Sequence, residues 1–409
     1  MIRKVRYFIF LRDVALLSVT CFGGPQAHFA QFQNILVRKR GYLDEAGLNE
    51  LNALAQVLPG PTSTQTLSAI GFRLGGPNLA YLTLLIWMLP SVAIMTSAGM
   101  IVSSLEAKDV SFAFTRFIQP MAVGMVAFAA YSMGLKTIKT KTGIALMIIA
   151  AIATYLVKNP FVFPITLLVA GSITAFKYRS HPKDENKPKG IRWENFFLWI
   201  GVLVIVGALG LITKALGYGE VLLPIRLFEN FYRNGSLVFG GGQVLTPMLY
   251  TEFVQYAPKR FLTTEEFLSG YALVQALPGP LFSFSAFIGA LAMRDFGPGG
   301  EIAGAAMSAL GMFLPGTFLI FFMIRVWDSL KKYRPIRASL EGINAANTGL
   351  IAAGAVLLFL PLLEGRHTTE NIALNFGMTI ATFALLAFTK VPSWAIIIIG
   401  LALGFVVKR

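Results

Sequence analysis

Glycine and proline clusters, rather than acids, bases or thiols, form the pattern in this chain that could do chemistry. The clusters are FGGPQAH at 22–28, LPGP at 58–61, FGGGQ at 239–243 and QALPGP at 275–280. A helix that begins directly after such a break exposes unpaired backbone N–H groups and the positive end of its dipole. This arrangement can bind an anion without a fixed positive side chain.

Hydroxyl and amide side chains lie close to these breaks and could donate hydrogen bonds to the oxygen atoms of an anion. For any single hydroxyl or glutamine, helix capping is an equally good explanation. The breaks themselves have a simpler alternative role, in which they only kink or closely pack membrane helices. The predicted substrate-binding set consists of Gly23, Gly24, Gln26, Gln56, Gly60, Thr62, Ser63, Thr64, Gly240, Gly241, Gly242, Gln243, Gln275, Gly279 and Ser283.

Charged and titratable residues are weaker candidates. Arg73 lies 12 residues beyond the LPGP motif, about 18 Å along a helix, which favours a position at the membrane rim over one at the anion. Asp13, Glu229 and Glu252 could each carry a coupling proton, or could be paired with a neighbouring arginine. His28 could titrate near neutral pH, and a polar pocket histidine without a proton role is the alternative.

The composition excludes a soluble enzyme. Of the 409 residues, 55% are hydrophobic and 13% are charged, whereas soluble domains carry about a quarter charged residues. The net charge of +15 would suggest nucleic-acid binding in a soluble protein. Basic residues also gather on the cytoplasmic flanks of membrane spans, so we expect a lipid bilayer as partner and no nucleic acid. The lone Cys21 excludes an intramolecular disulfide framework and a cysteine-based zinc site.

Catalytic and cofactor-binding motifs are missing from the sequence. A membrane-embedded enzyme that acts on a phosphate group needs clusters of acids, bases or metal ligands. The three histidines, His28, His181 and His367, are scattered, and no His-Glu-x-x-His motif occurs. No Gly-x-x-x-x-Gly-Lys-Ser/Thr motif occurs either, so we expect no ATP hydrolysis by this chain. The sequence predicts a protein that is not an enzyme and has no catalytic residues, cofactor or metal.

Uncharged stretches predict an all-α polytopic membrane protein, because a helix needs about 20 apolar residues to cross the hydrocarbon layer. Two pairs precede the first long stretch, 7–22 with 26–37 and 45–58 with 62–74, and each second arm is too short to cross. We expect these pairs to be re-entrant or broken hairpins with their Gly/Pro tips in the membrane interior. The predicted spans are 79–105, 117–135, 142–157, 159–176, 195–213, 302–324, 342–363, 371–389 and 391–407.

The motifs occur twice in the same order, which indicates an internal duplication. The two copies are separated by 217 to 225 residues, and Leu89-Pro90 and Gly124 recur as Leu314-Pro315 and Gly349. The predicted organisation is a first repeat over 1–176, a basic cytoplasmic linker over 177–192, a connecting transmembrane helix over 193–216 and a second repeat over 217–409.

Loop charges predict that the two repeats have inverted topology. The loop after the first Leu-Pro span has a net charge of −1, and its counterpart around 328–337 has +3. The next pair of loops, 136–141 and 364–370, shows the opposite signs. By the positive-inside rule, Met1, 136–141, 177–192 and 328–337 are then cytoplasmic, and 104–110, 364–370 and Arg409 lie outside. Inverted repeats are typical of transporters whose site lies at the repeat interface.

The paired FGG and PGP motifs resemble those of the chromate ion transporter family, in its long form with two fused repeats. The resemblance covers nearly the whole chain, with one internal departure, because Pro25 stands where the second half has Gly242. It implies a secondary transporter that exports chromate across the inner membrane and confers chromate resistance, with sulfate as a related oxyanion. The alternatives are a transporter or channel for sulfate or another oxyanion, and a membrane-embedded phosphate-handling enzyme. A homodimer is left open.

Overall fold

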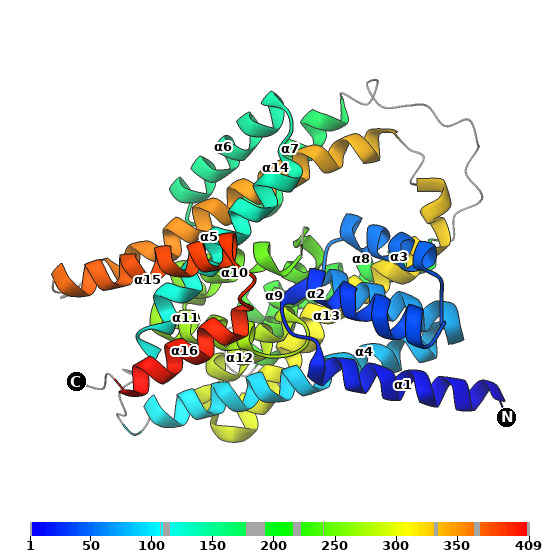
Figure 1. The fold of residues 1–409 in the computed structure, drawn as a ribbon, viewed down its shortest axis with the longest axis horizontal. Coiled ribbons are helices and arrows are strands. Elements are labelled where there is room, and N and C mark those ends of the chain that lie inside the picture. Colours follow the sequence, from blue (N-terminus) through cyan, green and yellow to red (C-terminus); the bar gives the residue numbers. More distant parts are fainter. Residues whose placement is uncertain are drawn as a thin grey trace. The chain divides into compact units, whose positions relative to one another are not determined.

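The computed structural model describes residues 2–106, 108, 115–176, 193–215, 222–239, 241–330, 334–363 and 369–406. Within these ranges the chain is helical and contains no strand (Figure 1), so the predicted all-α fold is confirmed. The described residues leave out Met1, the linker 177–192, Gly240 of the predicted site, Arg409 and parts of the loops 104–110, 328–337 and 364–370.

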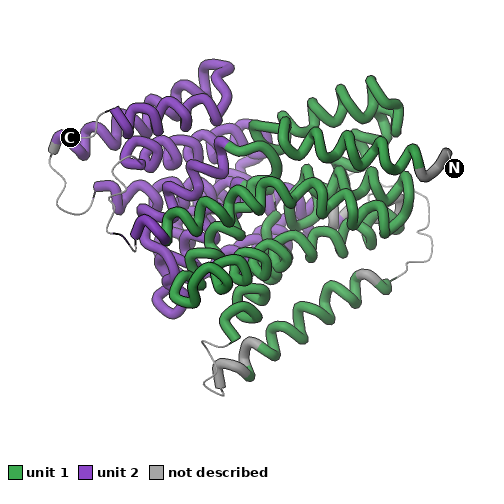
Figure 2. Tube along the Cα trace, turned by 90° about the horizontal axis from the view of Figure 1, so that it is seen from below, with its two compact units in different colours: residues 1–103, 189–242, 277–328 green, residues 104–188, 243–276, 329–409 purple. Residues whose placement is uncertain are grey.

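The helices form two compact units, and each unit contains segments of both sequence halves (Figure 2). Unit 1 comprises 1–103, 189–242 and 277–328, and unit 2 comprises 104–188, 243–276 and 329–409. The compact units therefore cut across the predicted repeats, and the repeat boundaries stay a prediction.

Unit 1 contains the helices on both sides of the FGGPQAH and LPGP motifs, the helix before FGGGQ and the short arm after QALPGP. Its π-helical segment η1 continues α2 without a break. The elements are α1 (Ile2–Thr20), α2 (Gly24–Phe32), η1 (Gln33–Lys39), α3 (Glu45–Val57), α4 (Thr62–Glu106), α8 (Glu194–Ala215), α9 (Leu223–Leu237), η6 (Leu281–Ser283), α12 (Phe284–Ala292), η7 (Arg294–Phe296) and α13 (Gly297–Leu330).

The first hairpin of unit 1 is joined by a buried carboxylate. Asp13 of α1 is 3% exposed and receives Arg40 at 2.8 Å and the Tyr42 hydroxyl at 2.9 Å. Because both partners follow η1, the segment after the FGGPQAH tip returns alongside α1. The Asp13 carboxylate raises the pKa of Arg40, and burial together with the bond to Asp13 raises the pKa of Tyr42 to about 12.

The second hairpin is joined at its open end by an ion pair. Arg73, near the end of the short arm that follows the PGP motif, lies 2.8 Å from Glu50 in the first part of α3. The arms therefore run antiparallel with the PGP motif at their tip, as the sequence predicts. Gly76 then breaks α4 with a φ of 77°, which separates the short arm from the long helix that follows it.

Unit 2 is built around α14, which packs against α5, α6 and α7. Glycines allow α14 to approach its neighbours closely. A Cβ added at Gly342 would lie 2.0 Å from the Ala170 carbonyl oxygen, and a Cβ added at Gly349 would lie 2.1 Å from the Met147 carbonyl oxygen, so neither position has room for a larger residue. The elements are α5 (Ile118–Thr137), α6 (Lys141–Leu156), α7 (Val162–Ala175), α10 (Gly242–Tyr250), η4 (Thr251–Gln255), η5 (Ala257–Lys259), α11 (Thr264–Ala276), α14 (Arg334–Phe359), η8 (Leu360–Leu362), α15 (Thr369–Phe388) and α16 (Ser393–Val406).

Long apolar helices make the chain a multi-pass membrane protein. Among the described residues, five helices are long and apolar enough to cross a bilayer: Thr62–Glu106, Ile118–Thr137, Arg294–Val326, Ala338–Leu362 and Glu370–Phe388. Shorter apolar helices include α6, α7 and α16. Many of their leucine, isoleucine and phenylalanine side chains are exposed, which is the expected state of a lipid-facing surface.

The two halves share local conformations that the duplication predicts. Gly76 and Gly297 both precede a long helix and both have positive φ, 77° and 70°. The helices after the two FGG motifs, α2 and α10, each continue into a π-helical segment, at Gln33 and at Thr251. π-helical turns are rare and frequently mark functional sites, so their recurrence is a specific sign of common architecture.

Candidate oxyanion site at the broken-helix tips

The glycines at the four tips adopt backbone conformations that other residues rarely tolerate. Gly24 and Gly241 have φ values of 78° and 86°, and Gly60 and Gly279 have 116° and 96°. Each pair occupies the same place in its repeat. Glycine populates positive φ without the steric cost that a Cβ imposes, so the sequence places glycine where the chain leaves one helix and enters the next.

Two equivalent backbone hydrogen bonds connect the tips within unit 1. The Gly60 N–H donates to the Val238 carbonyl at 2.7 Å, and the Gly279 N–H donates to the Cys21 carbonyl at 2.8 Å. Val238 and Cys21 each precede an FGG motif. The PGP tip of each half is therefore bonded to the FGG tip of the other half. This exchange places the PGP break of each half beside the FGG break of the other half.

A second pair of close contacts follows the same exchange. A Cβ at Gly60 would lie 3.3 Å from the Gly316 Cα, and one at Gly279 would lie 3.2 Å from the Ser91 Cβ. Gly316 and Ser91 each follow the proline of a Leu-Pro motif. In the first half only, a buried amide adds to this contact, because Gln65 Nε2 donates to the Pro59 carbonyl at 2.7 Å and to that of Gly316 at 3.2 Å. Sequence reasoning missed Gln65.

The start of α2 has the features of an open helix N-terminus. Its N-cap residue is Gly23, which has no side chain to accept from the first N–H groups, and Pro25 lies in the first turn. No described atom beyond the local backbone lies within 4 Å of the position that a Cβ would take on Gly24. Space is therefore open beside this tip. At the other FGG tip, the corresponding position on Gly241 meets only the Thr62 hydroxyl, at 3.8 Å.

Three of the predicted hydroxyls make hydrogen bonds within the protein. Ser63 pairs with His28 Nδ1 at 3.1 Å, and Thr64 Oγ1 accepts from the Trp87 indole N–H at 3.1 Å. Ser283 donates to the Pro280 carbonyl at 2.8 Å. These bonds fit the capping and packing alternative for the individual side chains. Among the predicted hydroxyls, Thr62 has the position that best suits a ligand contact, because it is buried beside Gly241.

The four predicted glutamines are divided between the two units, and two of them are exposed. Gln26 and Gln56 of unit 1 are exposed. Gln243 and Gln275 belong to unit 2, where Gln275 Nε2 donates to the Tyr271 hydroxyl at 2.7 Å. The structure thus places Thr62 beside Gly241 and bonds Gly60 and Gly279 to the residues that precede the two FGG motifs, with Gly23, Gly24 and Gly242 in the same unit.

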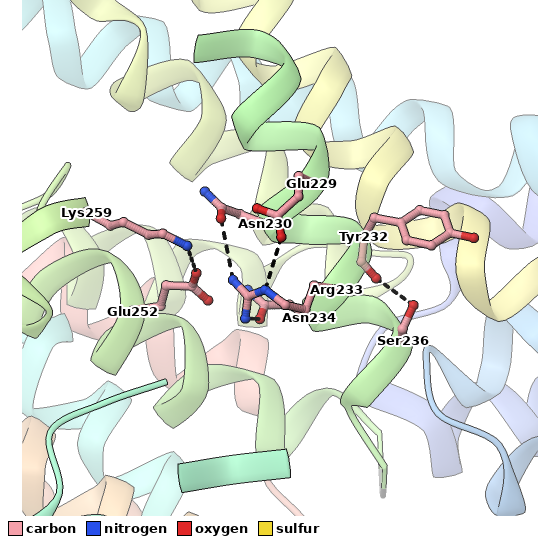
Figure 3. Close-up of polar contacts among 8 residues, drawn as sticks. All are labelled: Glu229, Asn230, Tyr232, Arg233, Asn234, Ser236, Glu252 and Lys259. Carbon is pink, nitrogen blue, oxygen red and sulfur yellow. Dashed lines mark hydrogen bonds and ion pairs between the residues drawn. The ribbon is translucent and has the colours of Figure 1, made fainter. Parts of the chain in front are cut away.

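The three acidic candidates all have basic partners. Asp13 receives Arg40, Glu229 lies 3.3 Å from Arg233, and Glu252 lies 2.7 Å from Lys259. The last two pairs belong to different units and are drawn in Figure 3. Pairing with a neighbouring base was the alternative role for these acids.

Arg233 is a partly buried cation that sequence reasoning missed. Its guanidinium lies on α9 and bonds to side chains of the same helix, Glu229 at 3.3 Å, Asn230 at 3.4 Å and Asn234 at 3.5 Å (Figure 3). The four-residue spacing of Glu229 and Arg233, which places them on one helix face, was the signal that could have identified the pair. Arg73, by contrast, lies at the open end of its hairpin, away from the PGP tip.

Comparison with known proteins supports the internal duplication of the chain. A family described as "Chromate transporter" matches residues 9–175 and again residues 225–405. The chain belongs to the chromate transporter family. Both family regions contain one FGG and one PGP tip, so the duplication and the resemblance inferred from the motifs are confirmed.

Curated relatives of this family member include chromate transport proteins. A probable chromate transport protein of Synechococcus elongatus is 26% identical over 92% of this chain and 87% of its own length. The chromate transport protein of Pseudomonas aeruginosa is 25% identical over 89% of this chain and 82% of its own length. An uncharacterised transporter of Bacillus subtilis is 29% identical over 41% of this chain and 85% of its own length, so it corresponds to one repeat. No solved structure gives a significant match.

Proposed function

We propose that this protein is a secondary transporter that exports chromate, a tetrahedral divalent oxyanion, across the inner (plasma) membrane and so confers chromate resistance. The names of the Synechococcus and Pseudomonas relatives support chromate as substrate. The observation that carries the proposal is the exchanged pair of hydrogen bonds, Gly60 to Val238 and Gly279 to Cys21. These bonds gather the broken-helix tips of both halves in unit 1.

The anion is held by backbone N–H groups at the starts of α2 and α4. Helix N-termini suit an oxyanion because their N–H groups are unpaired and their dipoles favour negative charge. The open space beside Gly24 leaves room for the anion, and Thr62 beside Gly241 contributes a hydroxyl. The two acids of unit 1, Asp13 and Glu229, are paired with bases, which reduces their repulsion of a dianion.

Membrane potential is sufficient to drive export in this scheme. Each unit of negative charge that leaves an inside-negative cell gains about 2.3 kcal/mol per 100 mV. The exchanged hydrogen bonds tie the two halves together at the tips, so a rocking motion of one half against the other would have to break them. The tips of both halves therefore move as one body during transport.

Flux into vesicles that contain only the purified protein tests the proposed function. Chromate, sulfate and molybdate are compared under potentials clamped with valinomycin and potassium. The proposal predicts chromate flux that increases with the imposed potential. Flux of sulfate with none of chromate would assign a different oxyanion, and a chromate flux indifferent to potential would contradict the energetic scheme.

The orientation of the chain is part of the same proposal, with the N-terminus in the cytoplasm and the repeats inverted. Single cysteines placed in a Cys21→Ser background at 104–110 and at 331–337 are labelled with an impermeant maleimide in intact cells. The inverted arrangement predicts labelling of the first loop and protection of the second. Labelling of both loops would contradict the inverted topology of the two repeats.

A further inference from the structure

His28 is a buried titratable residue that links the starts of two helices in the proposed anion site. It lies four residues beyond Gly24 on α2, and its side chain is 1% exposed. Its Nδ1 lies 3.1 Å from the hydroxyl of Ser63, in the first turn of α4. One imidazole on the second turn of α2 therefore contacts the first turn of α4, and these are the two helices whose N–H groups are assigned to the anion.

The surroundings of the imidazole contain no charged side chain among the contacts that the structure describes. On its own helix it lies near the Phe32 ring, and the Trp87 ring of α4 meets it in a T-shaped arrangement with 5.4 Å between ring centroids. The backbone of Cys21 at the FGG tip also interacts with it. The Cys21 thiol is the titratable group on that element, and it donates to Gln31. No carboxylate in this set balances a positive ring.

Apart from the interaction of the ring with the Cys21 backbone, the second ring nitrogen has no described hydrogen-bond partner. Nε2 of His28 is buried and lacks a partner among the described atoms. Buried polar atoms in native proteins are almost always paired, so an exception needs an explanation. The positive ring has two N–H donors, whereas the neutral ring has one donor and one acceptor. The protein therefore holds an imidazole beside the anion tips with one nitrogen able to accept a proton.

Anion and proton binding at these positions must affect each other. A neutral ring is favoured while the site is empty, because burial without an opposite charge disfavours the charged form. An oxyanion at the starts of α2 and α4 supplies that opposite charge and favours the imidazolium. By thermodynamic linkage, a bound proton increases anion affinity by the same factor.

We propose that His28 is the proton-binding residue of this transporter, taking up one proton when the oxyanion occupies the neighbouring helix N-termini and releasing it when the anion leaves. The proton is taken from hydronium in the surrounding water, so one O–H bond of hydronium breaks and one N–H bond to the imidazole forms, and release returns the proton to water. A dianion carried with one proton moves one net negative charge, so transport stays electrogenic. This inference rests on the proposed anion site.

A spectroscopic titration of His28 tests the inference without altering the residue itself. His181→Gln and His367→Gln leave His28 as the single histidine of the chain. The ¹⁵N-histidine spectrum of this protein in nanodiscs is titrated between pH 5 and 9, with sodium chromate or with sodium chloride at equal ionic strength. We expect chromate to raise the proton affinity of the ring by about 5- to 150-fold, the usual range of coupling between sites. Chromate binding is measured on the same sample by equilibrium dialysis.

The outcomes separate this inference from the proposed function. Chromate that binds while the His28 titration stays unchanged would overturn the proton role and leave the anion site intact. If chromate does not bind at all, both the proton role of His28 and the proposed anion site are contradicted.

Vesicle flux gives a second, independent readout. With a trapped pH dye, the protein should move one proton per chromate, and His28→Asn should carry chromate with no coupled proton. Ser63→Ala, which removes the partner of Nδ1 but not the ring, should retain coupling with a shifted pH midpoint. A His28→Asn variant that still moves one proton per chromate would contradict the proposal.

Discussion

The backbone N–H of Gly60 donates to the carbonyl of Val238 at 2.7 Å, although 178 residues separate them in the sequence. Its counterpart joins Gly279 to Cys21, so the tip of each PGP motif is held by the other half. Because both glycines have positive φ, the bonds depend on a conformation that side chains disfavour. Conformational strain at these two positions should therefore affect both halves.

Alanine at either PGP glycine should destabilise the protein and reduce transport. Gly60→Ala and Gly279→Ala each force a Cβ onto a positive-φ backbone, which costs about 1–3 kcal/mol, and each Cβ would also meet a neighbour at 2.9 to 3.2 Å. Thermal unfolding in detergent measures the change. The matched control is Gly201→Ala in α8, where a Cβ meets open space and stability should be equal or slightly higher. Equal unfolding temperatures for all three variants would contradict the strain argument.

Removal of the ion pair at the open end of the second hairpin should have a small effect on stability. Arg73 and Glu50 are both partly exposed, and exposed pairs contribute about 0–1 kcal/mol. Arg73→Gln, Glu50→Gln and the double variant should unfold within that range of each other, as measured by denaturant titration. Any effect of Arg73→Gln on chromate flux should shrink as salt rises, because an exposed charge is screened within about 10 Å at 0.1 M. A loss of chromate flux that does not depend on salt concentration would show that Arg73 contacts the substrate.

Tyr42 should contribute to stability at high pH, and the sign follows from its raised pKa. The phenol titrates near 10.0 when free and at about 12 in the folded protein, so folding favours the protonated form. Its contribution is complete below pH 10 and is lost as pH rises toward 12. Tyr42→Phe should therefore unfold more easily than wild type at pH 8, and the difference should narrow above pH 10. A stability difference that is constant from pH 8 to 12 would contradict the raised pKa of Tyr42.

The sequence predicted the helices and tips of this fold better than the contacts between them. Gly24, Gly60, Gly241 and Gly279 identify the tips because backbone conformation depends on residue type within a few positions. The bond between Gly60 and Val238 could not be predicted, since it depends on how the two repeats fold against each other. The compact units, which combine both halves, follow from the same long-range packing.

Side-chain roles at the site were predicted less well than the tips. Ser63 and Thr64 have the residue type of ligand donors, but His28 and Trp87 engage them, and both partners are distant in the sequence. Gln65 escaped notice because its acceptors include Gly316, from the other half. The location of Arg73 could be predicted from its sequence distance to the PGP tip alone, because that distance determines which end of the hairpin arm a residue occupies.

The chromate transport rate of four variants tests the central claim, that tip backbone rather than a cation binds the anion. Gly24→Val and Gly241→Val place a β-branched side chain on positive-φ backbone beside the proposed site. Cys21→Val, which introduces the residue found at the equivalent position of the second half, is the matched control, and Arg73→Gln is the comparison. In vesicles with equal amounts of folded protein, we predict no transport by the two glycine variants, normal transport by Cys21→Val and partial transport by Arg73→Gln. Normal transport by both glycine variants together with an inactive Arg73→Gln would show that a side-chain cation binds the substrate.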